Sequence, residues 1–206
     1  MAISFQTLVV AIVTVVFLHI WSTRYVWHQG TKYYEDTTKP AAILDIVHNN
    51  TPDWSAYNDT KNWFLLIYVI PFFMNRSNGD WISEAIIKAC IMFALRSLSI
   101  VATILPKDSR CKVNQLDPYH LTVGGTCYDK MFSGHFAFGL LSTSLLFKYG
   151  FVSDSVASIG LWSIINVMNF VLLTVTRGHY TQDLLVALFV VALVHLGYEK
   201  YVSNVI

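Results

Sequence analysis

Long apolar runs recur through the whole chain, and no other feature restricts its fold as strongly. The hydrocarbon core of a bilayer is about 30 Å thick, and about 20 mainly apolar helical residues cross it. Lipid offers no hydrogen-bond partner to irregular backbone, so runs of this length predict helices. The sequence therefore predicts an all-α, polytopic membrane protein: a six-transmembrane-helix bundle with spans at 3–21, 62–75, 81–105, 133–148, 156–175 and 183–202.

Composition supports this class and excludes others. Of the 206 residues, 54% are hydrophobic and 13% are charged, whereas about a quarter of the residues in a soluble domain are charged. The formal net charge is +1 and the basic residues are scattered, so the chain lacks the basic patch of a nucleic-acid-binding protein. No stretch resembles a second, soluble domain, and we expect residues 1–206 to form one membrane domain.

The first two runs differ from ordinary spans. Residues 3–21 follow no basic segment and precede no clear cleavage site, so we interpret them as an anchor rather than a signal peptide. Residues 62–75 are few and include Pro71, which fits either a span completed by its polar flanks or a re-entrant segment. With six spans, both long connections, 22–62 and 106–131, lie on the same side of the membrane as the turn at 177–183.

Which compartment that side faces is predicted from two features. Glycosylation sequons begin at Asn49 and Asn58 in the first long connection, and Cys111 and Cys127 in the second can form a disulfide in an oxidising compartment. The distribution of basic residues argues in the opposite direction. We expect a eukaryotic-type endomembrane protein of the Golgi, the endoplasmic reticulum or the plasma membrane, with this side toward the lumen or exterior.

Two histidine motifs lie at the starts of late runs, on the same predicted side: Ser133-Gly134-His135 and Arg177-Gly178-His179-Tyr180-Thr181-Gln182-Asp183. Ionisable groups at such a depth are costly unless they serve a function. His179 and Asp183 are four residues apart, so a helix would place them on one face. The carboxylate can then orient the imidazole as a nucleophile toward phosphorus, while His135 transfers protons. The alternative for the pair is a helix-capping contact.

Other residues of these motifs suit a phosphate group. Arg177 and Arg96 offer guanidinium donors, and Ser133 and Gly134 open a helix whose amino end attracts anions. Alternatives remain: Arg177 can reach lipid phosphates, and Arg96 can pair with Glu84 or with carbonyl groups. The remaining histidines are interpreted as interfacial polar residues: His19, His28, His48, His120 and His195.

Three segments, residues 96–106, 127–135 and 179–183, resemble the sphingomyelin synthase family in their order and approximate spacing. The resemblance covers roughly residues 90–190, the catalytic half of a six-span fold. That family is a branch of the lipid phosphate phosphatase superfamily. Its phosphatases generally carry a Lys seven residues before Arg-Pro, a Pro-Ser-Gly-His motif, and an Arg six residues before the second His.

This chain departs from the phosphatase pattern at each motif. Phe132 replaces the Pro, and Arg177 stands two residues before His179. Lys88 and Arg96 are one residue too far apart, and no Pro follows Arg96. The synthase pattern therefore fits better.

The resemblance to the synthases implies roles for particular residues. His135, His179 and Asp183 match the catalytic triad, with Asp129 and Tyr180 as supporting positions. The implied reaction transfers phosphocholine, or a related headgroup, from a glycerophospholipid to the primary hydroxyl of ceramide through a phosphohistidine, without a metal or other cofactor. Departures from the usual residues leave headgroup and acceptor open: Tyr128, Gly178 and Gln182.

The expected partners are membrane lipids, namely phosphatidylcholine or phosphatidylethanolamine, ceramide and diacylglycerol, and a homo-oligomer is left open. The enzymatic alternative is a lipid phosphatase or phospholipase C that uses water as acceptor. A second alternative is a non-catalytic transporter or lipid-binding protein, which the absence of an internal repeat disfavours.

Overall fold

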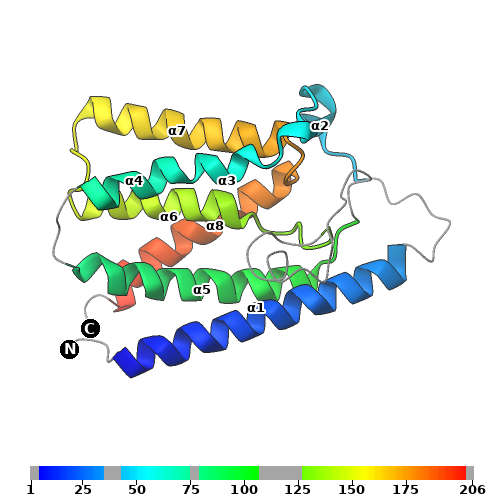
Figure 1. The fold of residues 1–206 in the computed structure, drawn as a ribbon, viewed down its shortest axis with the longest axis horizontal. Coiled ribbons are helices and arrows are strands. Elements are labelled where there is room, and N and C mark those ends of the chain that lie inside the picture. Colours follow the sequence, from blue (N-terminus) through cyan, green and yellow to red (C-terminus); the bar gives the residue numbers. More distant parts are fainter. Residues whose placement is uncertain (1–4, 35–42, 75–78, 107–126, 203–206) are drawn as a thin grey trace.

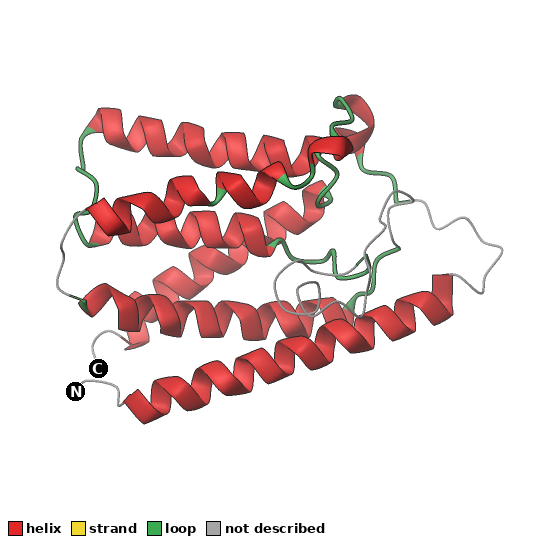
Figure 2. Cartoon of the chain, viewed as in Figure 1, coloured by secondary structure: helices red, strands yellow, loops and turns green. Residues whose placement is uncertain are grey.

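The structure is a computed structural model that describes residues 5–34, 43–74, 79–106 and 127–202. Every regular element in these ranges is helical, as Figure 2 shows, so the all-α prediction is confirmed for them. The longer helices are α1 (Phe5–Tyr34), α5 (Asp80–Ala102), α6 (Gly134–Lys148), α7 (Val156–Val175) and α8 (Thr181–Gly197), which continues as the π-helical turn η3 (Tyr198–Val202). The shorter ones are α2 (Ile46–Asn50), η1 (Ser55–Tyr57), α3 (Thr60–Phe64) and α4 (Leu66–Met74).

Four helical stretches within the described ranges are long and apolar enough to cross a membrane: Phe5–Tyr34, Trp81–Ala102, Val156–Val175 and Thr181–Val202. They support a membrane protein. The other two predicted spans are shorter. α6 has 15 residues, about 22 Å at 1.5 Å per residue, and the stretch Thr60–Met74 is divided into α3 and α4 at Leu65. Six complete spans therefore stay a prediction.

Two helices end at other residues than the predicted spans. The first helix continues past residue 21 to Tyr34, because its second half packs through small and apolar side chains. Val26 is fully buried with Ile100, and Gly30 lies so close to the Tyr128 ring that a Cβ there would be 2.5 Å from its Cγ. α5 ends at Ala102 rather than residue 105, ahead of Pro106, whose ring is incompatible with a helix interior.

The helices alternate in direction around a core between α5, α6, α7 and α8 (Figure 1). α1 lies along α5 at the edge of the bundle and runs in the same direction. The carboxyl ends of α1, α5 and α7 meet the amino ends of α6 and α8 at one end, on the right in Figure 1, opposite the two chain termini. Both histidine motifs therefore lie at the same end of the bundle, as the sequence predicts.

Candidate active site

The turn between α7 and α8 positions His179. After α7 ends, Arg177 takes a left-handed conformation (φ 57°), and the backbone amides of Gly178 and His179 both approach the Leu173 carbonyl, at 3.1 and 3.4 Å. A non-glycine residue costs about 1–2 kcal/mol in this conformation. The reversal places the buried His179 directly before the first turn of α8.

Asp183 both contacts His179 and caps α8, the two alternatives that its spacing suggested. Its Oδ2 accepts from the Tyr180 backbone amide at 2.9 Å, which caps α8, and lies 3.3 Å from His179 Nδ1. The carboxyl group is fully buried, and its Oδ1 has no hydrogen-bond partner in the described structure. Because Oδ2 already accepts from the Tyr180 amide, it is assigned as the acceptor for His179 as well. In that tautomer Nδ1 of His179 carries the proton, and Nε2 is left to act as a base or nucleophile.

His135 lies in the first turn of α6, beside the start of α8. Ser133 caps α6 by accepting from the Phe136 amide at 3.3 Å, and its own amide donates to the Asp183 carbonyl at 3.3 Å. This backbone bond joins the two helix starts that carry the histidines. His135 Nε2 donates to Asn62 Oδ1 at 2.7 Å, so a residue of α3 holds the second imidazole.

Two lysines surround the turn that carries His179. Lys130 Nζ donates to the Gly178 carbonyl at 2.6 Å, and the buried Lys61 ammonium lies 3.5 Å from where a Cβ on Gly178 would be. Burial first, and then the positive charges of Lys130 and Lys61, lower the pKa of His179 well below its ordinary value of 6.5. His179 is therefore neutral near pH 7.

Arg96 reaches the same region from α5 and pairs with Asp129. Its Nη2 donates to Asp129 Oδ2 at 2.8 Å, and its Nε donates to the Phe132 carbonyl at 3.3 Å. Gly134 is near the guanidinium, since a Cβ there would lie 3.8 Å from Arg96 Nε. Arg96 is thus held beside the amino end of α6 and makes no ion pair with Glu84, which excludes one of its predicted partners.

The structure directs Arg177 away from the histidines. Its guanidinium donates to the Thr51 carbonyl at 2.8 Å and to the Thr51 hydroxyl at 3.1 Å. Arg177 therefore ties the segment after α2 to the α7–α8 turn, and phosphate binding by this residue stays a prediction.

Sequence reasoning missed several residues that contact the site. Lys61 and Asn62 were interpreted only as polar flanks, and Lys130 was not singled out. His48, interpreted as interfacial, donates from Nε2 to the His179 carbonyl at 2.7 Å, with its ring 5.3 Å from that of Tyr180. The position of Lys61 and Asn62, directly before an apolar run on the predicted active side, was the one signal available.

Asp45 fixes the start of α8 from the same side. Its side chain accepts from the backbone amide and hydroxyl of Thr181, at 2.6 and 2.9 Å, and also caps α2. Burial favours the neutral acid, but the hydrogen bonds from Thr181 and His48 prevail and hold the pKa of Asp45 below its usual value. The loop before α2 and the α7–α8 turn therefore form one hydrogen-bonded unit.

The predicted disulfide is described at one end only. Cys127 is disulfide-bonded, whereas Cys111 lies outside the described residues. The described ranges contain no group of three or more His, Cys, Asp or Glu side chains arranged to hold a metal ion.

Residues 126–200 match the family model described as PAP2 superfamily C-terminal. The matched segment contains α6, α7 and α8 with both histidine motifs, and it supports the lipid phosphate phosphatase superfamily. Members of that superfamily are typically phosphoryl-transfer enzymes, so the match also supports phosphatase or phosphotransferase chemistry on lipid phosphates. No curated protein matches the chain.

Proposed function

We propose that this protein is a membrane phosphotransferase that moves phosphocholine, or a related phospho-headgroup, from a glycerophospholipid to the primary hydroxyl of ceramide. The observation that carries the proposal is the buried His179–Asp183 pair, 3.3 Å apart, at a helix start that is bonded to the helix start carrying His135. The resemblance of residues 96–106, 127–135 and 179–183 to sphingomyelin synthases supports the choice of acceptor.

The reaction has two steps. His179 Nε2 attacks phosphorus and the bond from phosphorus to the diacylglycerol oxygen breaks. His135, which is protonated in the complex with the anionic phosphate of the donor, transfers its proton to that oxygen. Diacylglycerol leaves, and a phosphohistidine remains. His135, now neutral, accepts the proton of the ceramide hydroxyl, whose oxygen attacks phosphorus while the phosphorus–nitrogen bond breaks. His179 is restored with its proton still on Nδ1 toward Asp183.

The cations around the turn stabilise the transferring group. Lys61, Lys130 and Arg96 supply positive charge, and the amino end of α6 at Ser133 and Gly134 adds backbone N–H groups. Preorganised donors act most strongly where water is excluded, and His179 and Asp183 are both buried. Asp129 orients Arg96 within this cluster.

Hydrolysis is the second candidate, because the matched family model belongs to a phosphatase superfamily. A lipid phosphatase or phospholipase C would use the same phosphohistidine and let water replace ceramide. A transporter or lipid-binding protein would exchange no headgroup. We further propose an endomembrane location with the histidine end toward the lumen or exterior.

Mass spectrometry of lipid products separates these candidates. The purified chain is placed in nanodiscs with phosphatidylcholine, phosphatidylethanolamine and ceramide, with H135A and H179A as controls. We expect ceramide that carries the transferred phospho-headgroup and diacylglycerol in equal amounts, and neither with the controls. Release of phosphocholine at the same rate without ceramide would replace the proposal with hydrolysis.

A further inference from the structure

An apolar cavity of about 320 Å³ lies between α1 and α5. Its walls come from Ile12–Ile20 of α1 and Ile86–Phe93 of α5, and its lining side chains are aliphatic or aromatic except for His19 and Cys90. Both helices qualify as membrane spans, so the cavity lies within the depth of the bilayer. Hydrocarbon is the material that such walls bind best.

One end of this cavity leads to the candidate active site. α1 and α5 run in the same direction, so His19 and Phe93 lie at the end nearer the histidine motifs (Figure 1). His19 is buried, and Arg96 Nη1 lies 3.3 Å from its Nδ1. Arg96 in turn donates to the Phe132 carbonyl just before α6. The apolar cavity therefore ends at a cation that adjoins the start of the helix carrying His135.

We propose that this cavity binds one acyl chain of the phospholipid donor, with the phosphate held beyond His19 toward Arg96. The inference rests on the proposed function and names the part of the fold that selects the donor. The volume of the cavity lies at the low end of the range for ligand pockets, about 300–1,000 Å³. It therefore suits one acyl chain rather than a whole lipid. Arg96 at one end is held by Asp129 through Nη2 and by the Phe132 carbonyl through Nε, and its Nη1 faces His19 at the end of the cavity. This guanidinium favours a lipid with a phosphate over ceramide or diacylglycerol, which have none.

Cys90 provides a test that requires no turnover. It is half-buried in the cavity wall, and it is the free cysteine among the residues that the structure describes. In detergent, long-chain phosphatidylcholine should slow maleimide labelling of Cys90, whereas dibutyryl phosphatidylcholine and long-chain diacylglycerol should protect it much less. Equal labelling rates with and without long-chain phosphatidylcholine would overturn the proposal, and so would equal protection by diacylglycerol.

A filling substitution tests the same cavity through activity. C90F places an aromatic ring in the space for the chain, and L98F, at a position 61% exposed on the same helix, is the matched control. Each buried methylene contributes about 0.8 kcal/mol, so C90F, by displacing about two methylenes, should lower the ratio of kcat/KM for long-chain over short-chain donors about tenfold. L98F should leave that ratio unchanged.

The proposed reaction and the proposed acyl-chain site can be overturned separately. If no headgroup transfer is found but long-chain phosphatidylcholine still protects Cys90, the proposed reaction fails and the lipid site stands. If transfer occurs while C90F keeps the chain-length ratio of the unsubstituted protein, the cavity is not the acyl site and the reaction stands.

Discussion

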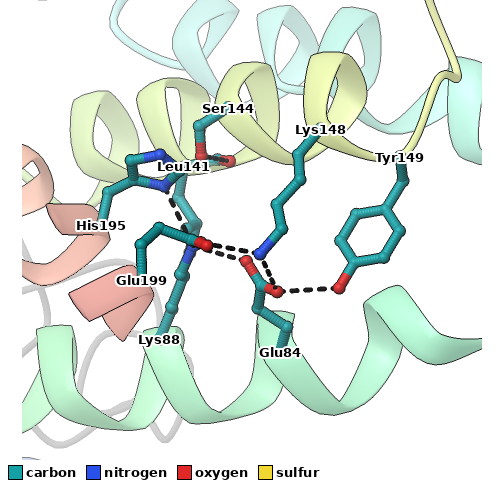
Figure 3. A network of polar contacts seen from close by, with 8 residues as sticks. All are labelled: Glu84, Lys88, Leu141, Ser144, Lys148, Tyr149, His195 and Glu199. Atoms are coloured by element: carbon teal, nitrogen blue, oxygen red, sulfur yellow. Dashed lines mark hydrogen bonds and ion pairs between the residues drawn. The ribbon is translucent and has the colours of Figure 1, made fainter. Parts of the chain in front are cut away.

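Two polar clusters lie at opposite ends of the helix bundle, and they differ in how their charges are balanced. At the end near the chain termini, Glu84 binds Lys88 through one oxygen and Lys148 through the other, the latter at 2.6 Å (Figure 3). Glu199 joins the same lysines at 3.1 and 2.7 Å. The Tyr149 hydroxyl donates to Glu84 at 2.8 Å. Two carboxylates therefore meet two ammonium groups.

The histidine end is balanced only in part, by the buried ion pair between Arg96 and Asp129. Lys130 donates only to a backbone carbonyl, Lys61 has no hydrogen bond or ion pair within the described ranges, and Asp183 Oδ1 is buried without a hydrogen-bond partner. A closed, neutral network ties helices together, whereas incompletely paired buried charges are typical of a site that awaits a ligand. The comparison therefore supports two proposals: the Glu84 cluster serves stability, and the histidine cluster binds the phosphate of a lipid.

Removal of the nucleophile has the largest expected effect. H179A should lower headgroup transfer by at least about a thousandfold, because no phosphohistidine can form. Its thermal unfolding midpoint in detergent should stay near that of the unsubstituted protein. His195 belongs to the Glu84 cluster, since its Nδ1 lies 2.9 Å from Lys88 Nζ (Figure 3). H195A is the matched control and should retain transfer. Comparable loss of transfer in both variants would erase the distinction between the two clusters.

The lysines of the histidine cluster come next. K130Q and K61M should each lower kcat/KM about tenfold to a hundredfold, as removal of a single transition-state contact usually does. K61M should also raise the unfolding midpoint, because it removes a buried cation that lacks an ion-pair partner. A lower midpoint together with unchanged kcat/KM would mark Lys61 as a structural residue.

A Lys→Met substitution in the Glu84 cluster should lower stability and leave activity unchanged, the reverse of K61M. K88M leaves the carboxylates of the Glu84 cluster with one ammonium group fewer, and breaking a buried pair costs about 3 kcal/mol or more. We expect a clearly lower unfolding midpoint, measured by differential scanning fluorimetry, and normal activity per folded molecule. Unchanged stability would show that the network does not tie the helices together.

The pH profile reports on the His179 environment. Burial, Lys130 and Lys61 lower the pKa of His179 well below 6.5, and the neutral ring is the active form. Activity should therefore persist as the pH falls through 6.5 and decline only at lower pH. K130Q removes one positive charge, raises the pKa of His179 and should move the acidic limb upward. An acidic limb near 6.5 that K130Q does not move would contradict this environment.

Arg177 should show the smallest effect. Its guanidinium binds Thr51 rather than the histidines. R177A should therefore lower kcat/KM, but by a factor several times smaller than the factor for K130Q. A larger loss than in K130Q would instead support the original prediction that Arg177 binds phosphate. Steady-state kinetics of the two variants under one set of conditions decides between them.

The parts of this structure that local patterns determine were predictable. Apolar run length predicted the helices, and the four-residue spacing of His179 and Asp183 predicted their contact. The contact forms at the capped start of α8, because His179 precedes that helix and Asp183 also accepts from the Tyr180 amide. Span counting also placed both histidine motifs at one end of the bundle, since it requires only the number of crossings between them.

Contacts between distant segments were not predictable. Asn62 meets His135, and His48 meets His179, across long stretches of chain that carry no spacing signal. The extension of α1 to Tyr34 depends on packing against Tyr128 and Ile100, which no local pattern encodes. Arg177 looked like a phosphate ligand by sequence position alone, but the fold of the turn directs it to Thr51.

The most direct test of the central claim, that His179 carries the phosphoryl group, is to trap the covalent intermediate. The protein is mixed with phosphatidylcholine in the absence of ceramide, quenched in base to preserve phosphohistidine, digested and mapped by mass spectrometry. We predict a headgroup-phosphate adduct on His179 that is absent in H179A and disappears when ceramide is added before the quench. An adduct on another residue, or transfer that proceeds at full rate in H179A, would contradict the account.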